Sequence, residues 1–196
     1  IHGDEIPATI LAKKWLARLA QIEPRNHWRI VPVLNPDGTA AKTRTNSRGV
    51  DLNRNFPTKD WNTAAQVNWK SLTAANSRRY PGPSGGSEPE TQCAIHHIED
   101  YHADLVVSIH SPLGVLDFDG PKYNFPRFKG GIKWVALGNF PGSLGRYMWK
   151  DRNQPVLTIE LREKFQETQE EIDQLQDIIG KLALEIVNNP PGNRVK

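Results

Sequence analysis

Several features that mark other protein classes are missing from this sequence of 196 residues. Its one cysteine, Cys93, cannot form an internal disulfide, and we expect it to be a small buried residue of a helix. No apolar run approaches the ~18 residues that a membrane-spanning helix needs, and no signal-peptide pattern is present. Basic clusters interleaved with aromatic residues are also missing. We therefore expect neither a membrane nor a nucleic-acid partner.

The composition that remains is that of an ordinary globular domain. Hydrophobic residues make up 37% of the chain and charged residues 24%, and a chain of this length can bury a core without disulfides. The mean hydropathy of -0.59 is on the polar side and predicts long loops. A net charge of +3 weakly favours anionic ligands.

Apolar periodicity and turn residues predict alternating helices and strands. Helices are predicted at residues 6–22, from the capping residue Ser87 to Tyr101, at Gly142–Trp149 and at Gln166–Val187. Strands are predicted at Trp28–Leu34, Asp104–His110, Ile132–Leu137 and Pro155–Leu161, whereas residues 39–86 are polar and irregular. The alternation predicts an α/β fold, a three-layer sandwich with a mostly parallel mixed sheet and helices on both faces.

Four residues have the chemistry of a catalytic zinc site. His2, Glu5 and His110 supply two imidazoles and a carboxylate, and Glu160 adds a free carboxylate that could activate water. His110 and Glu160 end or nearly end predicted strands, where ligands of α/β sheets gather. Each residue also has a simpler interpretation: His2 and Glu5 could share an exposed helical face, and His110 could be a core histidine. Apolar neighbours imply that Glu160 is buried, and a buried carboxylate must be paired or protonated.

The irregular region carries a second group of polar residues. Asn53 and Arg54 lie in Asp51-Leu-Asn-Arg-Asn-Phe-Pro57, and Arg54 could grip a carboxylate through two parallel hydrogen bonds. Arg44 offers a second guanidinium from the same region. The alternative for each arginine is a solvated basic loop.

The joint pattern resembles the zinc carboxypeptidase family, M14, over essentially the whole chain. The motifs that carry the resemblance are His2-x-x-Glu5, Asn35-Pro-Asp-Gly38, Arg44, Asp51-Leu-Asn-Arg-Asn-Phe56, Ser87-Glu-Pro-Glu90, His110 and Thr158-Ile-Glu-Leu161. Within the family, Gly-Val-Asp-Leu-Asn-Arg-Asn-Phe-Pro, Gly-Ser-Glu-Pro-Glu-Thr-Gln and Pro-Gly-Ser-Leu-Gly look most like bacterial murein peptide amidases. Those enzymes cut the γ-D-glutamyl–meso-diaminopimelate bond of cell-wall peptides.

The resemblance implies a role for each matching residue. His2, Glu5 and His110 would bind one zinc ion, and Glu160 would take a proton from the attacking water and deliver it to the leaving amine. Arg44 would stabilise the oxyanion of the tetrahedral intermediate. Asn53 and Arg54 would hold the substrate carboxylate on the leaving-group side.

The family's substrate-binding tyrosine is a departure. Its place falls near Leu137 or Gly138, and Tyr147 is predicted to belong to the following helix. Residues 117–131 also align poorly with the family. They are expected to form an exposed acidic loop, in which Asp117 and Asp119 could alternatively recognise the amine of diaminopimelate.

The leading hypothesis is a zinc metallopeptidase that acts on murein-derived peptides. Its alternatives are a carboxypeptidase that removes C-terminal amino acids, a deacylase of the aspartoacylase and succinylglutamate desuccinylase type, and a metal-free binding protein on a retained fold. Residues 1–196 are expected to form a single catalytic domain, with at least one further strand preceding Ile1. A cytoplasmic location in a bacterium is expected, and the sequence sets no oligomeric state.

Overall fold

The computed structural model describes residues 1–123 and 132–191, which form a mixed sheet with helices on both faces. The strands follow the order β1-β4-β2-β3. β1 pairs with β4 in parallel, β4 with β2 in antiparallel, and β2 with β3 in parallel. The strand bounds are Val106–His110 for β1, Leu113–Asp119 for β2, Lys133–Trp134 for β3 and Val156–Arg162 for β4.

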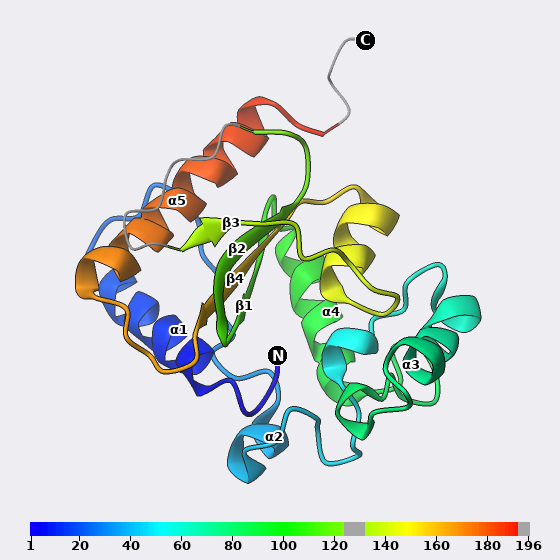
Figure 1. Ribbon diagram of the computed structural model, residues 1–196. Coiled ribbons are helices and arrows are strands. Elements are labelled where there is room, and N and C mark those ends of the chain that lie inside the picture. The colour runs from blue at the N-terminus through cyan, green and yellow to red at the C-terminus, as the bar shows by residue number, and fades with distance from the viewer. Residues whose placement is uncertain (124–131, 192–196) are drawn as a thin grey trace.

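Two long helices, α1 and α5, lie on one face of the sheet, and α4 lies on the other (Figure 1). Their bounds are Ile6–Leu19 for α1, Pro89–Tyr101 for α4 and Gln169–Asn188 for α5. The shorter helices are α2 (Pro36–Ala41), η1 (Leu52–Arg54), η2 (Trp61–Ala65), α3 (Gln66–Leu72), η3 (Ser77–Arg79) and η4 (Arg146–Lys150). None of the helices within the described residues is long and apolar enough to cross a membrane.

Side-chain alternation along β4 divides the core into two clusters. Leu157, Ile159 and Leu161 pack with residues of α1 and α5, whereas Val156 packs with residues of α4 and η4. Because successive strand residues point to opposite faces, Glu160 lies on the face that α4 covers. The alternation therefore places a carboxylate on one face while its neighbours fill the core on the other.

The predicted α/β class, with helices on both faces of a mixed sheet, is confirmed, but several elements differ. Residues 28–34 do not form a strand. A strand needs a neighbour for its N–H and C=O groups, and no strand in the described part of the chain pairs with this segment. It lines a cavity of about 600 Å³ together with residues of β1.

The strand β2 lies in a region that the sequence predicts to be irregular apart from a strand at Ile132–Leu137. That predicted strand shortens to Lys133–Trp134. The predicted helix at Gly142–Trp149 is present in shifted form, because residues 144–152 are helical and their middle part is the π-helical η4. The N-cap position of α4 is Glu88 and not Ser87, and the Glu88 side chain makes no capping hydrogen bond. The Ser87 hydroxyl donates to the Glu88 carboxylate. Cys93, expected to be buried, is exposed.

Candidate active site

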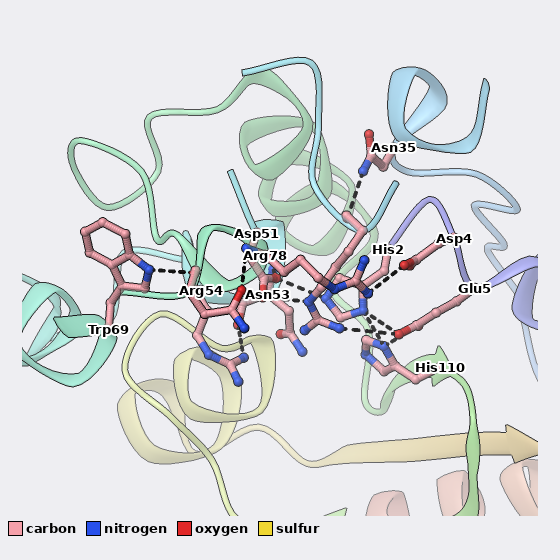
Figure 2. Close-up of polar contacts among 12 residues, drawn as sticks. His2, Asp4, Glu5, Asn35, Asp51, Asn53, Arg54, Trp69, Arg78 and His110 are labelled. Atoms are coloured by element: carbon pink, nitrogen blue, oxygen red, sulfur yellow. Dashed lines mark hydrogen bonds and ion pairs between the residues drawn. The ribbon is translucent and has the colours of Figure 1, made fainter. Parts of the chain in front are cut away.

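His2, Glu5 and His110 converge on one point although they come from distant parts of the chain (Figure 2). The first two precede α1, and His110 ends β1. Glu5 Oε1 lies 2.7 Å from His2 Nδ1, Glu5 Oε2 lies 2.8 Å from His110 Nδ1, and the two Nδ1 atoms are 3.2 Å apart. All three side chains are buried. Their potential ligand atoms lie within 4.8 Å of one another.

The turn from His2 to Glu5 is held in position by close packing of its backbone against α2. A Cβ atom on Gly3 would lie 2.0 Å from the carbonyl carbon of Gly38 in α2, so only glycine allows the two segments to touch. Asn35 orders the same contact, because its Oδ1 accepts a 2.9 Å hydrogen bond from Gly38 N–H at the start of α2. The Asn-Pro-Asp-Gly motif therefore forms a capped helical turn against which the turn before α1 packs.

The far nitrogen of each imidazole has its own partner. His2 Nε2 lies 3.0 Å from Asp51 Oδ1, and His110 Nε2 lies 2.9 Å from Ser108 Oγ. Burial alone would raise the pKa of Asp51, but the charge and hydrogen bond of His2 and the nearby Arg44 hold it well below its usual value. A metal ion on Nδ1 would leave the His2 proton on Nε2, where the Asp51 carboxylate, which only accepts hydrogen bonds, would hold it.

The donor set fits a divalent cation on chemical grounds. The Nδ1 atoms of His2 and His110 both face the Glu5 carboxylate. Burial lowers the pKa of His110 to about 4, although Glu5 opposes this shift. Burial would raise the pKa of Glu5, but both imidazoles outweigh it and the carboxyl remains ionised. Two imidazoles and a carboxylate whose potential ligand atoms face one another are a typical ligand set for zinc.

Glu160 lies beside this group without joining it. Its Cα pairs with that of His110 across the parallel β1–β4 ladder, so both side chains lie on the same face. Burial and the negative charge of Glu5 raise the pKa of Glu160 to about 7, against a hydrogen bond from Leu113 N–H. Its Oε2 atom is buried and accepts no hydrogen bond from the described residues. A carboxylate with this pKa and a free oxygen is suited to proton transfer.

Arg44 belongs to the irregular region and lies beside the group formed by His2, Glu5 and His110. Its Nε donates to Asp51 Oδ2 at 2.9 Å, and its Nη1 is 3.6 Å from Glu5 Oε1. The Arg44 carbonyl oxygen accepts a 3.4 Å hydrogen bond from Asn35 Nδ2. The guanidinium is therefore anchored next to the predicted metal ligands.

Asn53 and Arg54 follow Asp51 in the short helix η1. Asp51 Oδ1 accepts a 3.0 Å hydrogen bond from Asn53 N–H, which caps that helix. Asn53 Oδ1 accepts a 2.9 Å hydrogen bond from Leu144 N–H, which leaves the Nδ2 group to donate elsewhere. Arg54 Nη1 donates to the Asn53 carbonyl oxygen at 2.7 Å. Asp51 thus organises both groups, a role that the sequence motif contained but that was not predicted for this residue.

At the place where the resemblance puts the family's substrate-binding tyrosine, the sequence has Leu137 and Gly138. Tyr147 is 4% exposed and packs with Phe56 in the core, with ring centroids 5.6 Å apart. The expectation of an acidic loop is wrong for Asp117 and Asp119, which belong to β2. Burial and the proximity of Asp119 raise the pKa of Asp117. Residues 124–131 of the predicted loop lie outside the described residues.

An α/β fold that gathers imidazoles and carboxylates at the ends of neighbouring strands is typical of metal-dependent hydrolases. A model of the family described as zinc carboxypeptidase matches residues 8–136. The chain therefore belongs to the zinc carboxypeptidase family, whose members are hydrolases.

Murein peptide amidases are among the similar proteins. Murein peptide amidase A of Escherichia coli K12 is 38% identical over 120 residues, which are 59% of this chain and 48% of the relative. The protein of the same name from Vibrio campbellii is 33% identical over 171 residues, 82% of this chain and 66% of the relative. The chain thus spans about half the length of the first of these relatives and about two thirds of the second.

Solved structures share the fold. Murein-tripeptide amidase from Escherichia coli O157 has a TM-score of 0.58 and 25% identity, covering 98% of this chain and 80% of that one. Thrombin-activatable fibrinolysis inhibitor has a TM-score of 0.68 at 19% identity, covering 96% of this chain and 60% of that one. The second likeness concerns the fold alone.

Proposed function

We propose that this protein is a zinc-dependent amidase that hydrolyses the γ-D-glutamyl–meso-diaminopimelate bond of murein peptides. The observation that carries the proposal is the convergence of His2, Glu5 and His110 beside the unbonded oxygen of Glu160. The names of the similar amidases support the choice of substrate.

The bound zinc would be held by His2, Glu5 and His110, with Asp51 and Ser108 orienting the imidazoles from behind. When bound, zinc polarises the scissile carbonyl and lowers the pKa of water to about 7. The protein supplies the rest of the chemistry through side chains that are already in place.

Glu160 transfers the proton. Its Oε2 atom has no hydrogen bond to give up among the described residues, so it is free to accept a proton from the attacking water. A pKa of about 7 lets the same carboxyl hold that proton and return it to the leaving amine. Arg44 donates to the oxygen that becomes negative as the carbonyl carbon turns tetrahedral.

Asn53 and Arg54 hold the carboxylate of the leaving group. Asn53 presents Nδ2 because its oxygen is already bonded to Leu144 N–H. Arg54 retains Nε and Nη2, because Nη1 is the one donor of its guanidinium that is hydrogen-bonded to a described residue, through the Asn53 carbonyl oxygen. These donors form a neutral and a charged contact of the kind that recognises a carboxylate.

The same two residues could also hold the α-carboxylate of an ordinary peptide, which makes a C-terminal carboxypeptidase the second candidate. Carboxypeptidase N catalytic chain of Mus musculus is 34% identical over 116 residues, 52% of this chain. Both candidates require the same zinc and the same Glu160, so the difference lies in the substrate.

The purified zinc-loaded protein should therefore be incubated with γ-D-Glu-meso-diaminopimelate tripeptide and with simple C-terminal peptides, with products identified by mass spectrometry. We expect release of diaminopimelate from the tripeptide, at a kcat/KM at least ~10-fold above that for any simple peptide. Faster cleavage of simple peptides would favour the carboxypeptidase, and no cleavage of either by the zinc-loaded protein would overturn the proposed function.

A further inference from the structure

The loop Phe140–Leu144 is docked onto the segment that carries the proposed carboxylate-binding residues. Phe56 N–H donates to the Gly142 carbonyl oxygen at 2.9 Å, and Gly142 N–H donates to Thr58 Oγ1 at 3.0 Å. Leu144 N–H donates to Asn53 Oδ1 at 2.9 Å. The two segments are far apart in sequence, yet these hydrogen bonds hold them as one unit.

Gly142 makes this close approach possible. Its φ is +80°, and a Cβ atom there would lie 1.8 Å from the Arg54 carbonyl oxygen. Any side chain would therefore push the loop away from Arg54. The loop backbone lies directly against the residue that we propose binds the substrate carboxylate.

Phe140 brings its ring to the side chain of the same arginine. The guanidinium carbon of Arg54 lies 4.7 Å from the centroid of the Phe140 ring. Arg54 is half-buried, and burial lowers its pKa. Among the described residues no carboxylate forms an ion pair with Arg54, and its Nη1 is bonded to the Asn53 carbonyl oxygen. A partly desolvated guanidinium is thus held by a ring and a carbonyl oxygen, and its other donors have no hydrogen-bond partner among the described residues.

We propose that Phe140 is a positioning residue for substrate binding, whose ring fixes the plane of the Arg54 guanidinium so that Nε and Nη2 face the carboxylate of the leaving group. The inference rests on the proposed function, in which Arg54 binds that carboxylate. An aromatic ring covers one face of the guanidinium without occupying its in-plane N–H donors, so stacking and carboxylate binding are compatible.

The expected effect is on substrate capture. A contact between a guanidinium and an aromatic ring contributes a factor of about 2 to 30 in an equilibrium, and a pre-set guanidinium loses less freedom when the carboxylate binds. Phe140 does not touch the scissile bond in this arrangement. Its removal should therefore raise KM and leave kcat nearly unchanged.

The chain offers a matched control. The guanidinium carbon of Arg29 lies 4.7 Å from the ring of Tyr101, at the same distance as in the Arg54–Phe140 pair. This second pair joins the 28–34 segment to α4 and involves none of the proposed catalytic or binding residues. Phe140 is 41% exposed, so replacing it with leucine should not disrupt the core.

The test compares Phe140→Leu, Phe140→Tyr and Tyr101→Leu on the murein tripeptide. We expect KM to rise about 2- to 30-fold in Phe140→Leu with little change in kcat, and to return close to the original value in Phe140→Tyr. Tyr101→Leu should leave KM unchanged. In an Arg54→Ala background, Phe140→Leu should add nothing further, because the two changes remove one interaction. An unchanged KM in Phe140→Leu, or an equal rise in the Arg54→Ala background, would overturn the proposal.

A second measurement separates this inference from the proposed function. The Nε–H signal of Arg54, identified by its loss in Arg54→Lys, should carry a ring-current shift that disappears in Phe140→Leu and persists in Phe140→Tyr. If no peptide is cleaved but the shift behaves in this way, the proposed function fails and the stacking stands. If the tripeptide is cleaved but the signal does not move in Phe140→Leu, the amidase stands and the positioning role is wrong.

Discussion

Glu5 and Glu160 are carboxylates of one site that differ in almost every partner. Both imidazoles contact Glu5 within 2.8 Å, and Arg44 lies 3.6 Å away, whereas Glu160 has a buried oxygen with no hydrogen bond from the described residues. The pKa of Glu5 is held below its usual value, and that of Glu160 is raised to about 7. Two side chains of one chemical type are thereby prepared for different tasks.

The difference follows from what each carboxylate faces. Cationic or hydrogen-bonding neighbours favour the charged form, which a metal ligand needs, and they outweigh the burial of Glu5. Burial and the charge of Glu5 disfavour a second negative charge, so Glu160 keeps affinity for a proton. The charge of the ligand Glu5 thus helps to set the pKa of the base Glu160, and four measurements on side-chain variants can test how far the two roles are separate.

The largest effect is expected from Glu160→Gln. Removal of the group that both accepts and returns the proton should lower kcat on the murein tripeptide by about 10³- to 10⁴-fold. Glu163→Gln, a change to an exposed glutamate beyond the end of β4, is the control and should retain full activity. Near-normal turnover in Glu160→Gln would remove this residue from the mechanism.

A smaller loss is expected from Arg44→Lys. Lysine keeps the positive charge near Glu5 but cannot reproduce the planar donors, so kcat should fall about 10²-fold with little change in KM. Arg48→Lys serves as the comparison. Arg48 is exposed, and its Nη1 forms a long ion pair of 3.9 Å with Glu88, which is not one of the proposed catalytic or binding residues. A rise in KM with unchanged kcat would show that Arg44 binds the substrate and does not stabilise the oxyanion.

The smallest effect concerns stability of the metal-free protein against pH. Because the pKa of Glu160 is raised from 4.5 to about 7, its contribution to stability is fully present below about pH 4.5 and is lost as the pH rises through 7. Glu160→Gln removes this titration, so its Tm should fall less between pH 5 and pH 8 than that of the parent protein. Glu163→Gln should follow the parent curve, and parallel curves for all three proteins would contradict the raised pKa.

Local hydrogen bonding explains which parts of the molecule could be predicted from the sequence. The helix predicted at Gln166–Val187 begins with a reciprocal cap between Thr168 and Glu171, whereas α2, which Asn35 caps, was not predicted as a helix. Such contacts join residues a few positions apart, so sequence patterns preserve them. The grouping of His2, Glu5 and His110 was also predictable, because strand ends and the family motifs indicated it independently.

Contacts between distant segments explain what the sequence did not predict. The strand β2 forms because it pairs with β4, and its Leu113 N–H reaches Glu160, a contact that no local pattern encodes. The apolar run at residues 28–34 looks as strand-like as β1 but lacks a paired neighbour among the described strands. Phe140 was missed for the same reason, since its partner Arg54 lies in a different part of the chain.

The assignment of Glu5 as a zinc ligand and of Glu160 as the base is tested most directly by zinc affinity. This affinity can be measured by competition with a chelator for the parent protein, Glu5→Gln and Glu160→Gln. Loss of residues that only orient a ligand already costs about 10- to 100-fold in affinity, so we predict at least a ~100-fold loss for Glu5→Gln. Glu160→Gln should stay within about threefold of the parent, since its carboxylate holds no metal. Equal affinities for the two variants, whether both weakened or both unchanged, would contradict the assignment of Glu5 as ligand and Glu160 as base.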